Sequence, residues 1–294
     1  MRPRLLVTGG SGFLGSAIVR RAVASWQTSF TYCRSQPAAG PGTAFRLDLA
    51  DPEAIRRVVE AVRPDVVLHS AMGRSAAEHA AVTALGSREL ALAVARQGAA
   101  LLHLSSYMVF DGERAPYDED AAPAPITLYG RAKAEAEAGV RTAHPHAVVA
   151  RLSLLYCLDP PDPRAAQVLR DLEAGSPVTF FTDELRCPAE VGDVADALLA
   201  AAARLAARAS HDARGGLPEV LHLAGPEVMS RWEFGTSFLE ALQVPTRGVR
   251  ASRIADSGLV RPRDLTMVSR RTPRELTAPL RPWAAVLAGR SAIS

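Results

Sequence analysis

The chain has 294 residues, of which 48% are hydrophobic, and its formal net charge is +3. A chain of this length can bury a large core, as one large α/β unit or as two closely packed domains. The basic residues are scattered, without the Lys/Arg runs that mark a nucleic-acid or membrane surface. No stretch approaches the roughly 18 apolar residues of a membrane span. We therefore expect no nucleic-acid partner and no membrane.

Cysteines are few in the chain. Cys33, Cys157 and Cys187 are too few and too far apart for a zinc site or a disulfide framework, so we expect no metal. Reduced cysteines are typical of the cytosol, and the apolar run at residues 5–7 is too short for the core of a signal peptide. A cytoplasmic protein is the expectation.

Apolar strand patterns alternate with helical patterns through the first half of the chain. The predicted strands are residues 4–8, 29–33, 44–47, 66–70, 100–105 and 147–152, and the predicted helices are residues 12–24, 52–62, 76–97 and 128–139. Asp51 and Pro52 suit the cap and the first position of the second helix. This alternation predicts an α/β fold with a doubly wound parallel sheet of the Rossmann type.

A glycine-rich turn follows the first predicted strand and opens the first helix. Gly9, Gly12 and Gly15 form the pattern GxxGxxG. Glycine allows a tight turn, close approach of the backbone to a pyrophosphate and close packing of helix on strand. The N–H groups at the start of the helix can then bind the anion. In this βαβ context the turn predicts a dinucleotide site rather than a plain connector.

The end of the second strand is where such a site distinguishes NAD from NADP. An acidic residue there binds the ribose 2′-OH of NAD, but residues 31–35 contain no acid. Arg34 can pair with a 2′-phosphate through two parallel hydrogen bonds, and Ser35 can add a hydroxyl donor. We therefore predict that NADPH is preferred over NADH. The alternative is that Arg34 is an ordinary solvated residue at a strand end.

Residues 111–125 form a predicted loop between a strand end and the next helix, because they carry three prolines and five acidic residues. Ligands bind outside such strand ends in open α/β sheets. Tyr129 and Lys133 on the following helix share one face. A cation beside a tyrosine lowers its pKa from the ordinary value of about 10. The pair therefore predicts a tuned general acid/base; a core tyrosine near a solvated lysine is the alternative.

The alternation weakens after residue 152. Helices are predicted at residues 164–174, 191–208 and 231–242, with one short strand at 220–223. We expect residues 1–152 to form the dinucleotide-binding domain and residues 153–294 to form a smaller, mixed lobe that mainly binds substrate. The two are expected to pack as one globule, and a return of the chain to the first sheet stays open.

Along nearly its whole length the chain resembles the extended short-chain dehydrogenase/reductases. The glycine turn and the YxxxK pair are joined by segments similar to those of the family at residues 46–51 and 64–71. Within the family, the likeness is to the dTDP-4-dehydrorhamnose reductase group, which reduces 4-keto sugars on nucleotide diphosphates and includes regulatory subunits. It rests on residues 104–112, 116–119, 129–130, 183–186, 191–195, 222–227 and 261–264.

The resemblance implies the catalytic residues. Ser106 takes the hydroxyl position that hydrogen-bonds the substrate carbonyl, and Ser105 is an adjacent hydroxyl that could exchange roles with it. Tyr129 donates a proton to the developing alkoxide while hydride arrives from nicotinamide C4. Lys133 binds the nicotinamide ribose and lowers the pKa of the tyrosine. Such a reaction needs a positioned hydride and donors already in place.

The resemblance also implies the ligand contacts. Asp48 would reach the adenine. From the sequence itself, Arg186 is the residue we expect at the diphosphate of the substrate, with a structural ion pair as the alternative. The full set of cofactor residues is Gly9, Ser11, Gly12, Phe13, Leu14, Gly15, Arg34, Ser35, Asp48, Leu49, Ser70, Ala71, Met72 and Lys133. The substrate residues are Ser105, Tyr107 and Arg186.

Two segments depart from the family pattern. Thr83 stands where an asparagine is frequent, and His69-Ser70-Ala71 stands where Asn-Ala-Ala is common. Sugar 4,6-dehydratases carry an Asp-Glu pair after the catalytic hydroxyl, but these positions are Tyr107 and Met108 here, so dehydration is not expected. The prediction is an NADPH-dependent reductase of a 4-keto sugar nucleotide, monomeric or homodimeric. An epimerase or other carbonyl reductase, and a non-catalytic NADP-binding regulatory subunit, stay open.

Overall fold

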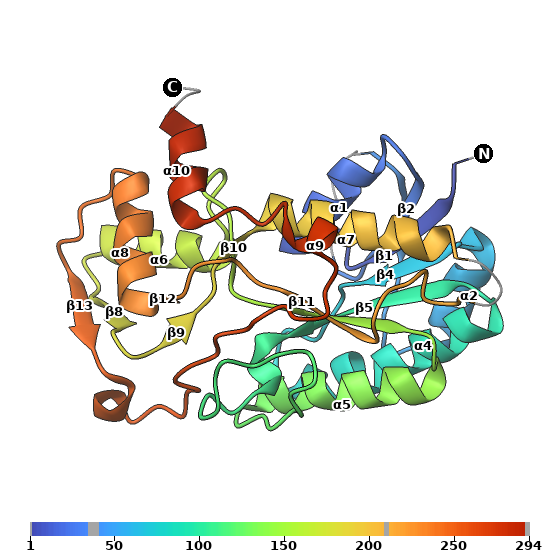
Figure 1. The fold of residues 1–294 in the computed structure, drawn as a ribbon, viewed down its shortest axis with the longest axis horizontal. Helices are drawn as coiled ribbons and strands as arrows, with labels where there is room; N and C mark the ends of the chain where they lie inside the picture. Colours follow the sequence, from blue (N-terminus) through green and yellow to red (C-terminus); the bar gives the residue numbers. More distant parts are fainter. Residues whose placement is uncertain (1, 35–40, 209–211, 292–294) are drawn as a thin grey trace.

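A parallel sheet runs through the centre of the protein, for which a computed structural model describes residues 2–34, 41–208 and 212–291 (Figure 1). Its strands are β1 (Arg4–Thr8), β2 (Gln27–Tyr32), β3 (Thr43–Arg46), β4 (Val66–His69), β5 (Ala100–Ser106), β6 (Val148–Leu152) and β11 (Val220–Leu223). They lie in the order β11-β6-β5-β4-β1-β2-β3, and all their pairings are parallel. The doubly wound sheet is therefore confirmed.

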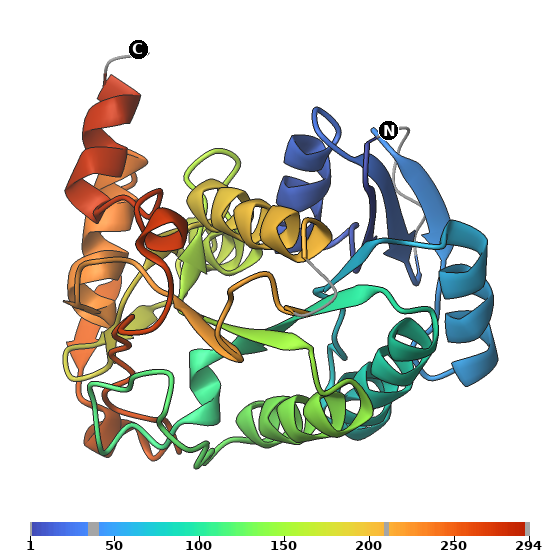
Figure 2. The same cartoon turned by 45° about the vertical axis from the view of Figure 1, so that its right-hand side comes forward.

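Helices cover both faces of this sheet. On one face lie α1 (Phe13–Ala22) and α7 (Val191–Ala206), and on the other lie α2 (Pro52–Val62), α4 (Gly86–Arg96) and α5 (Leu128–Ala143) (Figures 1 and 2). Burial on both sides explains why the strands are apolar runs without alternation. Within β1, for example, Leu5 packs toward α1 and α7, whereas Leu6 packs toward α2 and α4.

The predicted helix at residues 76–97 is continuous, but part of it is π-helical rather than α-helical. It begins as α3 (Ala76–Glu78), widens into the π-helical segment η1 (His79–Leu85) and continues as α4. Thr83 is fully buried there, and its hydroxyl accepts a hydrogen bond from the Gly73 N–H at 2.9 Å. The wider turn thus ties the helix to the segment that follows β4. Amphipathic periodicity does not distinguish a π-turn from an α-turn at this length.

The remaining elements build a smaller lobe beside the sheet, on the left in Figure 1. In it β8 (Val178–Phe181) pairs with β13 (Val249–Ser252), β7 (Leu155–Tyr156) with β10 (Ala189–Glu190), and β9 (Leu185–Arg186) with β12 (Met229–Ser230). Its helices are α6 (Pro163–Glu173), α8 (Arg231–Ala241) and α10 (Trp283–Ser291), with the short turn η3 (Ile254–Ser257). The short helix α9 (Arg274–Thr277) instead packs beside α7, and the turn η2 (Tyr107–Val109) follows β5 and contacts α5. The chain returns to the large sheet at β11.

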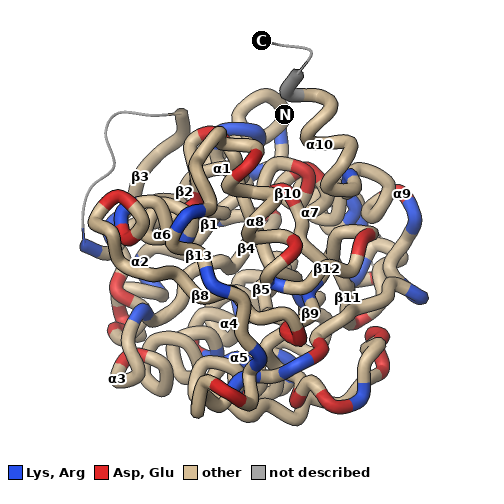
Figure 3. Tube along the Cα trace, turned by 90° about the vertical axis from the view of Figure 1, so that its left-hand side faces the viewer, with Lys and Arg blue, Asp and Glu red and all other residues tan. Residues whose placement is uncertain are grey.

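Charged residues of both signs are interspersed along the trace in Figure 3, in keeping with the scattered basic residues of the sequence. Within residues 2–34, 41–208 and 212–291, no helix combines the length and apolar character needed to cross a bilayer. The same residues contain no group of three or more His, Cys, Asp or Glu side chains placed to hold a metal ion.

Glu119 fastens the acidic loop that follows β5 to the C-terminal segment. Its carboxylate accepts hydrogen bonds from the N–H groups of Arg270, Arg271 and Thr272 at 2.9–3.1 Å and from the Thr272 hydroxyl at 2.8 Å. The Thr272 hydroxyl oxygen also accepts from the His222 N–H of β11 at 2.8 Å. Burial opposes ionisation of Glu119, but these hydrogen bonds outweigh it and leave its pKa below the ordinary value.

We expect Glu119→Gln to lower the free energy of unfolding by about 2 kcal/mol at pH 7, because an amide cannot accept all four hydrogen bonds. The folded pKa is the lower one, so this stabilisation is present above the ordinary pKa of 4.5 and is lost as pH falls through the folded value. Urea unfolding from pH 7 to pH 3 measures it. Glu113→Gln, an exposed acid in the same loop, is the control. Equal losses for both variants would contradict the assignment.

Candidate active site

The predicted site residues gather at the carboxyl ends of β1, β4 and β5. The strand order reverses between β1 and β4, which is the switch point where open α/β sheets bind ligands. Gly9 begins the turn with a φ of 68°, and a Cβ there would lie 2.8 Å from Ala71 Cα. A Cβ at Gly15 would lie 2.1 Å from the Gly9 oxygen. Only glycine fits either position, so the turn lies directly against the segment after β4.

The start of α1 is suited to an anion. Gly12 is its N-cap and supplies no side-chain hydrogen bond, and its first turn contains no acid. Ser11 and Gly12 are exposed, while Phe13 and Leu14 pack on the core beneath. The unpaired N–H groups and the helix dipole favour a pyrophosphate here. The residues present therefore fit a dinucleotide, with Gly9 to Gly15 holding its phosphates.

The other predicted cofactor residues border this turn on both sides. The Ser70 hydroxyl donates to the Thr8 oxygen at 2.7 Å, and Met72 is 39% exposed. Asp48 is exposed, with its carboxylate accepting from the Ala50 N–H at 2.9 Å, and Leu49 beside it is buried. Ser35 lies outside the described residues.

Arg34 is paired in the structure. Its guanidinium contacts the carboxylate of Glu78 in α3, and its side chain is still 58% exposed. The sequence offered no signal for this partner, because Glu78 lies 44 residues further along the chain.

The three predicted catalytic residues lie where α5 meets the end of β5. The Ser106 hydroxyl accepts from the Met108 N–H at 3.2 Å, and Lys133 Nζ donates to the Leu104 oxygen at 2.8 Å. Tyr129 is half-buried in the first turn of α5. A Cβ at Gly130 would lie 2.1 Å from the Met108 oxygen, so glycine allows α5 to approach η2 closely. This approach sets Tyr129 beside Ser106.

Burial dominates the titration of this group. It raises the pKa of Tyr129, while interaction with the Ser106 hydroxyl and the charge of Arg164 oppose the rise. The net shift is upward, contrary to the lowering by Lys133 expected from the sequence, and it leaves the phenol protonated, as a proton donor requires. Burial also lowers the pKa of Lys133 to about 8, against the opposing charge of Glu137.

Two histidines lie beside the site, and one of them, His69, departs from the family pattern. His69 is fully buried, with Nδ1 2.6 Å from the Thr8 hydroxyl and Nε2 2.9 Å from the Ser87 hydroxyl. It thereby links the strand that carries the glycine turn to α4. His79 begins the π-helical segment, and its ring centroid lies 5.7 Å from that of Tyr129. No sequence signal indicated this contact, because the two residues are far apart in the chain.

Arg186, suggested by the sequence as a diphosphate ligand, is occupied elsewhere. Only 2% of its side chain is exposed. It pairs with Glu184 at 2.8 Å and donates to the carbonyl oxygens of Leu185, Pro262 and Arg263 at 2.6–3.1 Å. The structural ion pair, which was the alternative, is the arrangement found.

The remaining predicted substrate residues lie beside it. The Arg186 guanidinium carbon lies 5.4 Å from the centre of the Tyr107 ring, and Tyr107 is buried. Ser105 is also buried, and its hydroxyl has no hydrogen-bond partner among the described residues. Ser106 between them is buried to a similar degree, so Ser105 and Tyr107 stay predicted substrate contacts.

Two other arginines line a cavity of about 50 Å³ in the lobe, and the charge of one of them, Arg164, acts on Tyr129. Arg164 comes from α6 and Arg231 from α8, and the rest of the lining is Asp162 with apolar residues such as Phe180 and Phe234. Neither guanidinium has a hydrogen bond or ion pair to a described residue. Burial lowers the pKa of Arg231; interaction with Tyr107 and Glu184 opposes this shift, and the charges of Arg164 and Arg186 add to it. Sequence reasoning missed both, since isolated arginines carry no pattern.

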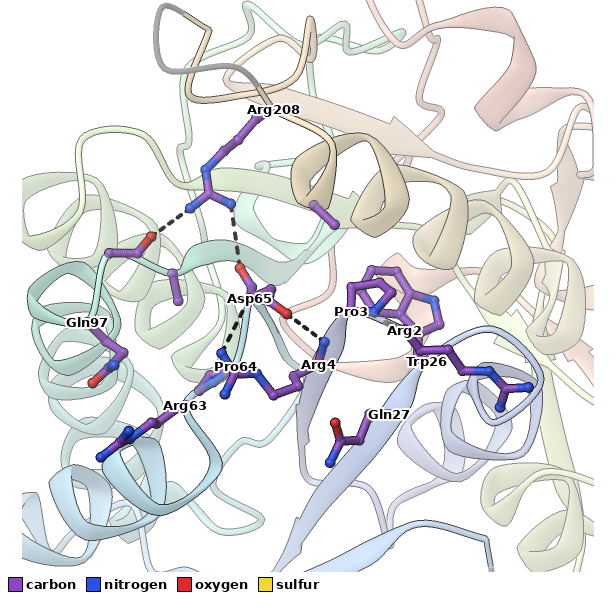
Figure 4. A pocket seen from close by; sticks show the side chains of 13 residues that line it. Arg2, Pro3, Arg4, Trp26, Gln27, Arg63, Pro64, Asp65, Gln97 and Arg208 are labelled. Carbon is purple, nitrogen blue, oxygen red and sulfur yellow. Dashed lines mark hydrogen bonds and ion pairs between the residues drawn. The ribbon is translucent and has the colours of Figure 1, made fainter.

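A wider hollow of about 1170 Å³ lies at the opposite, amino-terminal edge of the sheet (Figure 4). Its lining includes Arg4 and Arg208, which are engaged in holding the strand ends together. The Arg4 N–H donates to the Asp65 carboxylate at 2.7 Å, and Arg208 donates to the Gly98 oxygen at 2.6 Å. The Ser-Tyr-Lys group is absent from this lining, so we place the chemistry at the carboxyl edge despite its smaller cavity.

Comparison with known proteins identifies the family. Residues 2–290 match the model of the RmlD substrate binding domain. The dTDP-4-dehydrorhamnose reductase of Mycobacterium tuberculosis is 32% identical over 302 aligned residues, covering 97% of this chain and 91% of that protein. The methionine adenosyltransferase 2 subunit beta of Xenopus tropicalis is 31% identical over 260 residues, covering 84% of this chain and 74% of that protein.

The fold has a solved counterpart of nearly equal extent. The dTDP-4-dehydrorhamnose reductase of Bacillus anthracis, solved in complex with NADP, superposes with a TM-score of 0.78 at 21% identity, covering 100% of this chain and 99% of that one. The chain therefore belongs to the RmlD substrate binding domain family, within the extended short-chain dehydrogenase/reductases, a class of NAD(P)-dependent oxidoreductases.

Proposed function

We propose that the protein reduces the carbonyl of a 4-keto sugar nucleotide with NADPH. The observation that carries this proposal is the grouping of Ser106, protonated Tyr129 and Lys133 beside an anion-binding glycine turn. Bound NADPH supplies a hydride for the carbonyl carbon. In this account residues 1–152 mainly hold the cofactor and residues 153–294 mainly hold the substrate.

The protein's own residues handle the proton and the developing charge. Ser106 donates a hydrogen bond to the carbonyl oxygen and orients it toward Tyr129. Tyr129 then transfers its phenolic proton to that oxygen, which gives an alcohol and leaves a phenolate. The ammonium of Lys133 stabilises the phenolate electrostatically, because charge that appears in a buried site is best met by a donor already in place. Solvent returns the proton to Tyr129 afterwards.

Arg164 and Arg231 supply the argument for a nucleotide-linked substrate. Neither guanidinium forms an ion pair within the described residues, although Asp162 also lines the cavity and the charge of Glu184 acts on Arg231. Both guanidiniums are therefore free to bind a diphosphate with paired hydrogen bonds. The apolar lining around them suits the rings that flank a diphosphate in a sugar nucleotide. A dTDP-linked sugar is the first substrate to test, because it appears in the names of the reductase relatives.

A second candidate function comes from the other relatives. Vertebrate proteins named as the beta subunit of a methionine adenosyltransferase are about equally similar to this chain. The protein in this reading binds a dinucleotide and regulates a partner enzyme without turning over substrate. The intact Ser106, Tyr129 and Lys133 favour reduction over this reading.

Replacing Tyr129 by phenylalanine tests the proposed acid. We expect Tyr129→Phe to lower kcat by about a thousandfold, because positioned acids contribute roughly 10²–10⁴ in rate. NADPH affinity should stay unchanged. The control is Tyr156→Phe, which removes a buried hydroxyl without a hydrogen-bond partner among the described residues. NADPH oxidation with a panel of 4-keto sugar nucleotides is the assay, and a full rate for Tyr129→Phe would remove Tyr129 from the mechanism.

The pKa of Lys133 predicts a pH limit for cofactor binding. Since burial lowers this pKa to about 8, the ammonium is lost as pH rises through that value. We expect the Kd for NADPH to be constant from pH 6 to 7.5 and to rise above about pH 8. Fluorescence titrations across pH 6–10 measure it, with Lys133→Met lacking the inflection. A constant Kd up to pH 10 would contradict the role of the ammonium.

The cavity arginines are tested by their effect on substrate binding. We expect Arg164→Gln and Arg231→Gln each to raise the KM for a sugar nucleotide by about tenfold or more, since charged hydrogen bonds contribute roughly 1.5–3 kcal/mol. NADPH affinity should not change. Arg170→Gln is the matched control, because Arg170 lies on the same helix but does not line the cavity and donates only to Gln167 at 2.7 Å. Unchanged KM values in the two cavity variants would show that neither arginine binds the diphosphate.

A further inference from the structure

The glycine turn lies between the end of β2 and the segment that follows β4. On one side the Gly9 N–H donates to the Thr31 hydroxyl of β2 at 3.1 Å. On the other side a Cβ at Gly9 would lie 2.8 Å from Ala71, which follows β4. This agrees with the sheet order, in which β1 lies between β4 and β2. A dinucleotide bound at the turn therefore has the ends of β2 and β4 on its two flanks.

The Arg34–Glu78 pair connects the segments that follow these two strands. Arg34 follows β2, whereas Glu78 belongs to α3 and follows β4. Their contact thus crosses the carboxyl end of β1, over two strand spacings of about 4.8 Å each. It passes the part of the molecule where the adenosine ribose of a dinucleotide lies if its phosphates occupy the turn.

Glu78 is the fixed member of the pair. Its second carboxylate oxygen accepts from the Arg74 N–H at 2.7 Å, and its side chain is 29% exposed. Its own N–H donates to the Ser75 hydroxyl at 3.3 Å, and Gly73 packs against its backbone. The side chain of Arg34 is 58% exposed and is therefore the member that can change partner.

We propose that Glu78 is a specificity-determining residue for the cofactor, because it competes with the 2′-phosphate of NADPH for the Arg34 guanidinium. This proposal rests on the NADPH preference in the function proposed above. A guanidinium offers one planar fork for bidentate pairing, so Arg34 cannot serve the Glu78 carboxylate and a 2′-phosphate equally well. NADH has no such phosphate, so its binding leaves the Arg34–Glu78 pair in place. Glu78 therefore weakens NADPH binding selectively and limits the discrimination between the two cofactors.

The test is a double-mutant cycle on the full chain, with Kd values for NADPH and NADH measured by fluorescence titration. We expect Glu78→Gln to bind NADPH about two- to fivefold more tightly, the range an exposed ion pair is worth, with the Kd for NADH unchanged. In the Arg34→Gln background, Glu78→Gln should bring no further gain. Glu219→Gln removes one acid from another Arg–Glu surface pair, at the opposite edge of the sheet, and should change neither Kd.

The cycle separates this proposal from the one on which it rests. If the wild-type protein binds NADH as tightly as NADPH, the proposed NADPH preference fails. If NADPH is preferred but Arg34→Gln leaves the ratio of the two Kd values unchanged, Arg34 does not recognise the phosphate and the role of Glu78 is overturned. If Arg34→Gln changes the ratio but Glu78→Gln does not, the NADPH preference stands and the role of Glu78 is overturned. A gain from Glu78→Gln that persists in the Arg34→Gln background also overturns it, since the carboxylate then acts without Arg34.

Discussion

The close approach of α5 to the end of β5 is the contact on which the site depends. Gly130 permits it, because any side chain there would collide with the Met108 oxygen. Lys133 secures it through a hydrogen bond from its ammonium to the Leu104 oxygen. A buried ammonium needs such a partner, and the same burial that makes the bond necessary brings its pKa into a range where it responds to pH. The Lys133 side chain therefore both holds α5 against β5 and carries the charge proposed for the reaction.

Buried ion pairs determine which charges remain for ligands. Arg151 is held by Glu137 at 2.9 Å, and Arg186 is held by Glu184 at 2.8 Å, all four side chains being nearly inaccessible. These pairs fix α5 to the sheet and the lobe to its own loops, and they leave no donor free for a substrate. Arg164 and Arg231, which line the lobe's cavity, have no such ion pair within the described residues, and we propose them as the pair that binds the substrate diphosphate.

Much of this arrangement could be predicted from the chain. Strands buried on both faces are apolar runs, and Asp51 with Pro52 marks a helix start that the structure confirms, since the Asp51 carboxylate accepts from the Ala54 N–H. The glycine turn was predictable because its spacing reflects a steric requirement. The partner of Arg34, the cavity arginines and the π-turn at His79 were not, because they arise from contacts between distant segments. The lowered pKa expected for Tyr129 was wrong because sequence spacing shows neighbouring charge but not burial.

Transfer of a labelled hydride tests the central claim most directly. The protein is incubated with NADPH carrying deuterium at nicotinamide C4 and with a dTDP-linked 4-keto sugar, and the sugar product is analysed by mass spectrometry and NMR. We expect a product with one deuterium, located at C4 of the sugar, formed as NADPH is consumed. Tight NADPH binding with no deuterium in any of a panel of 4-keto sugar nucleotides would contradict reduction and favour the regulatory function.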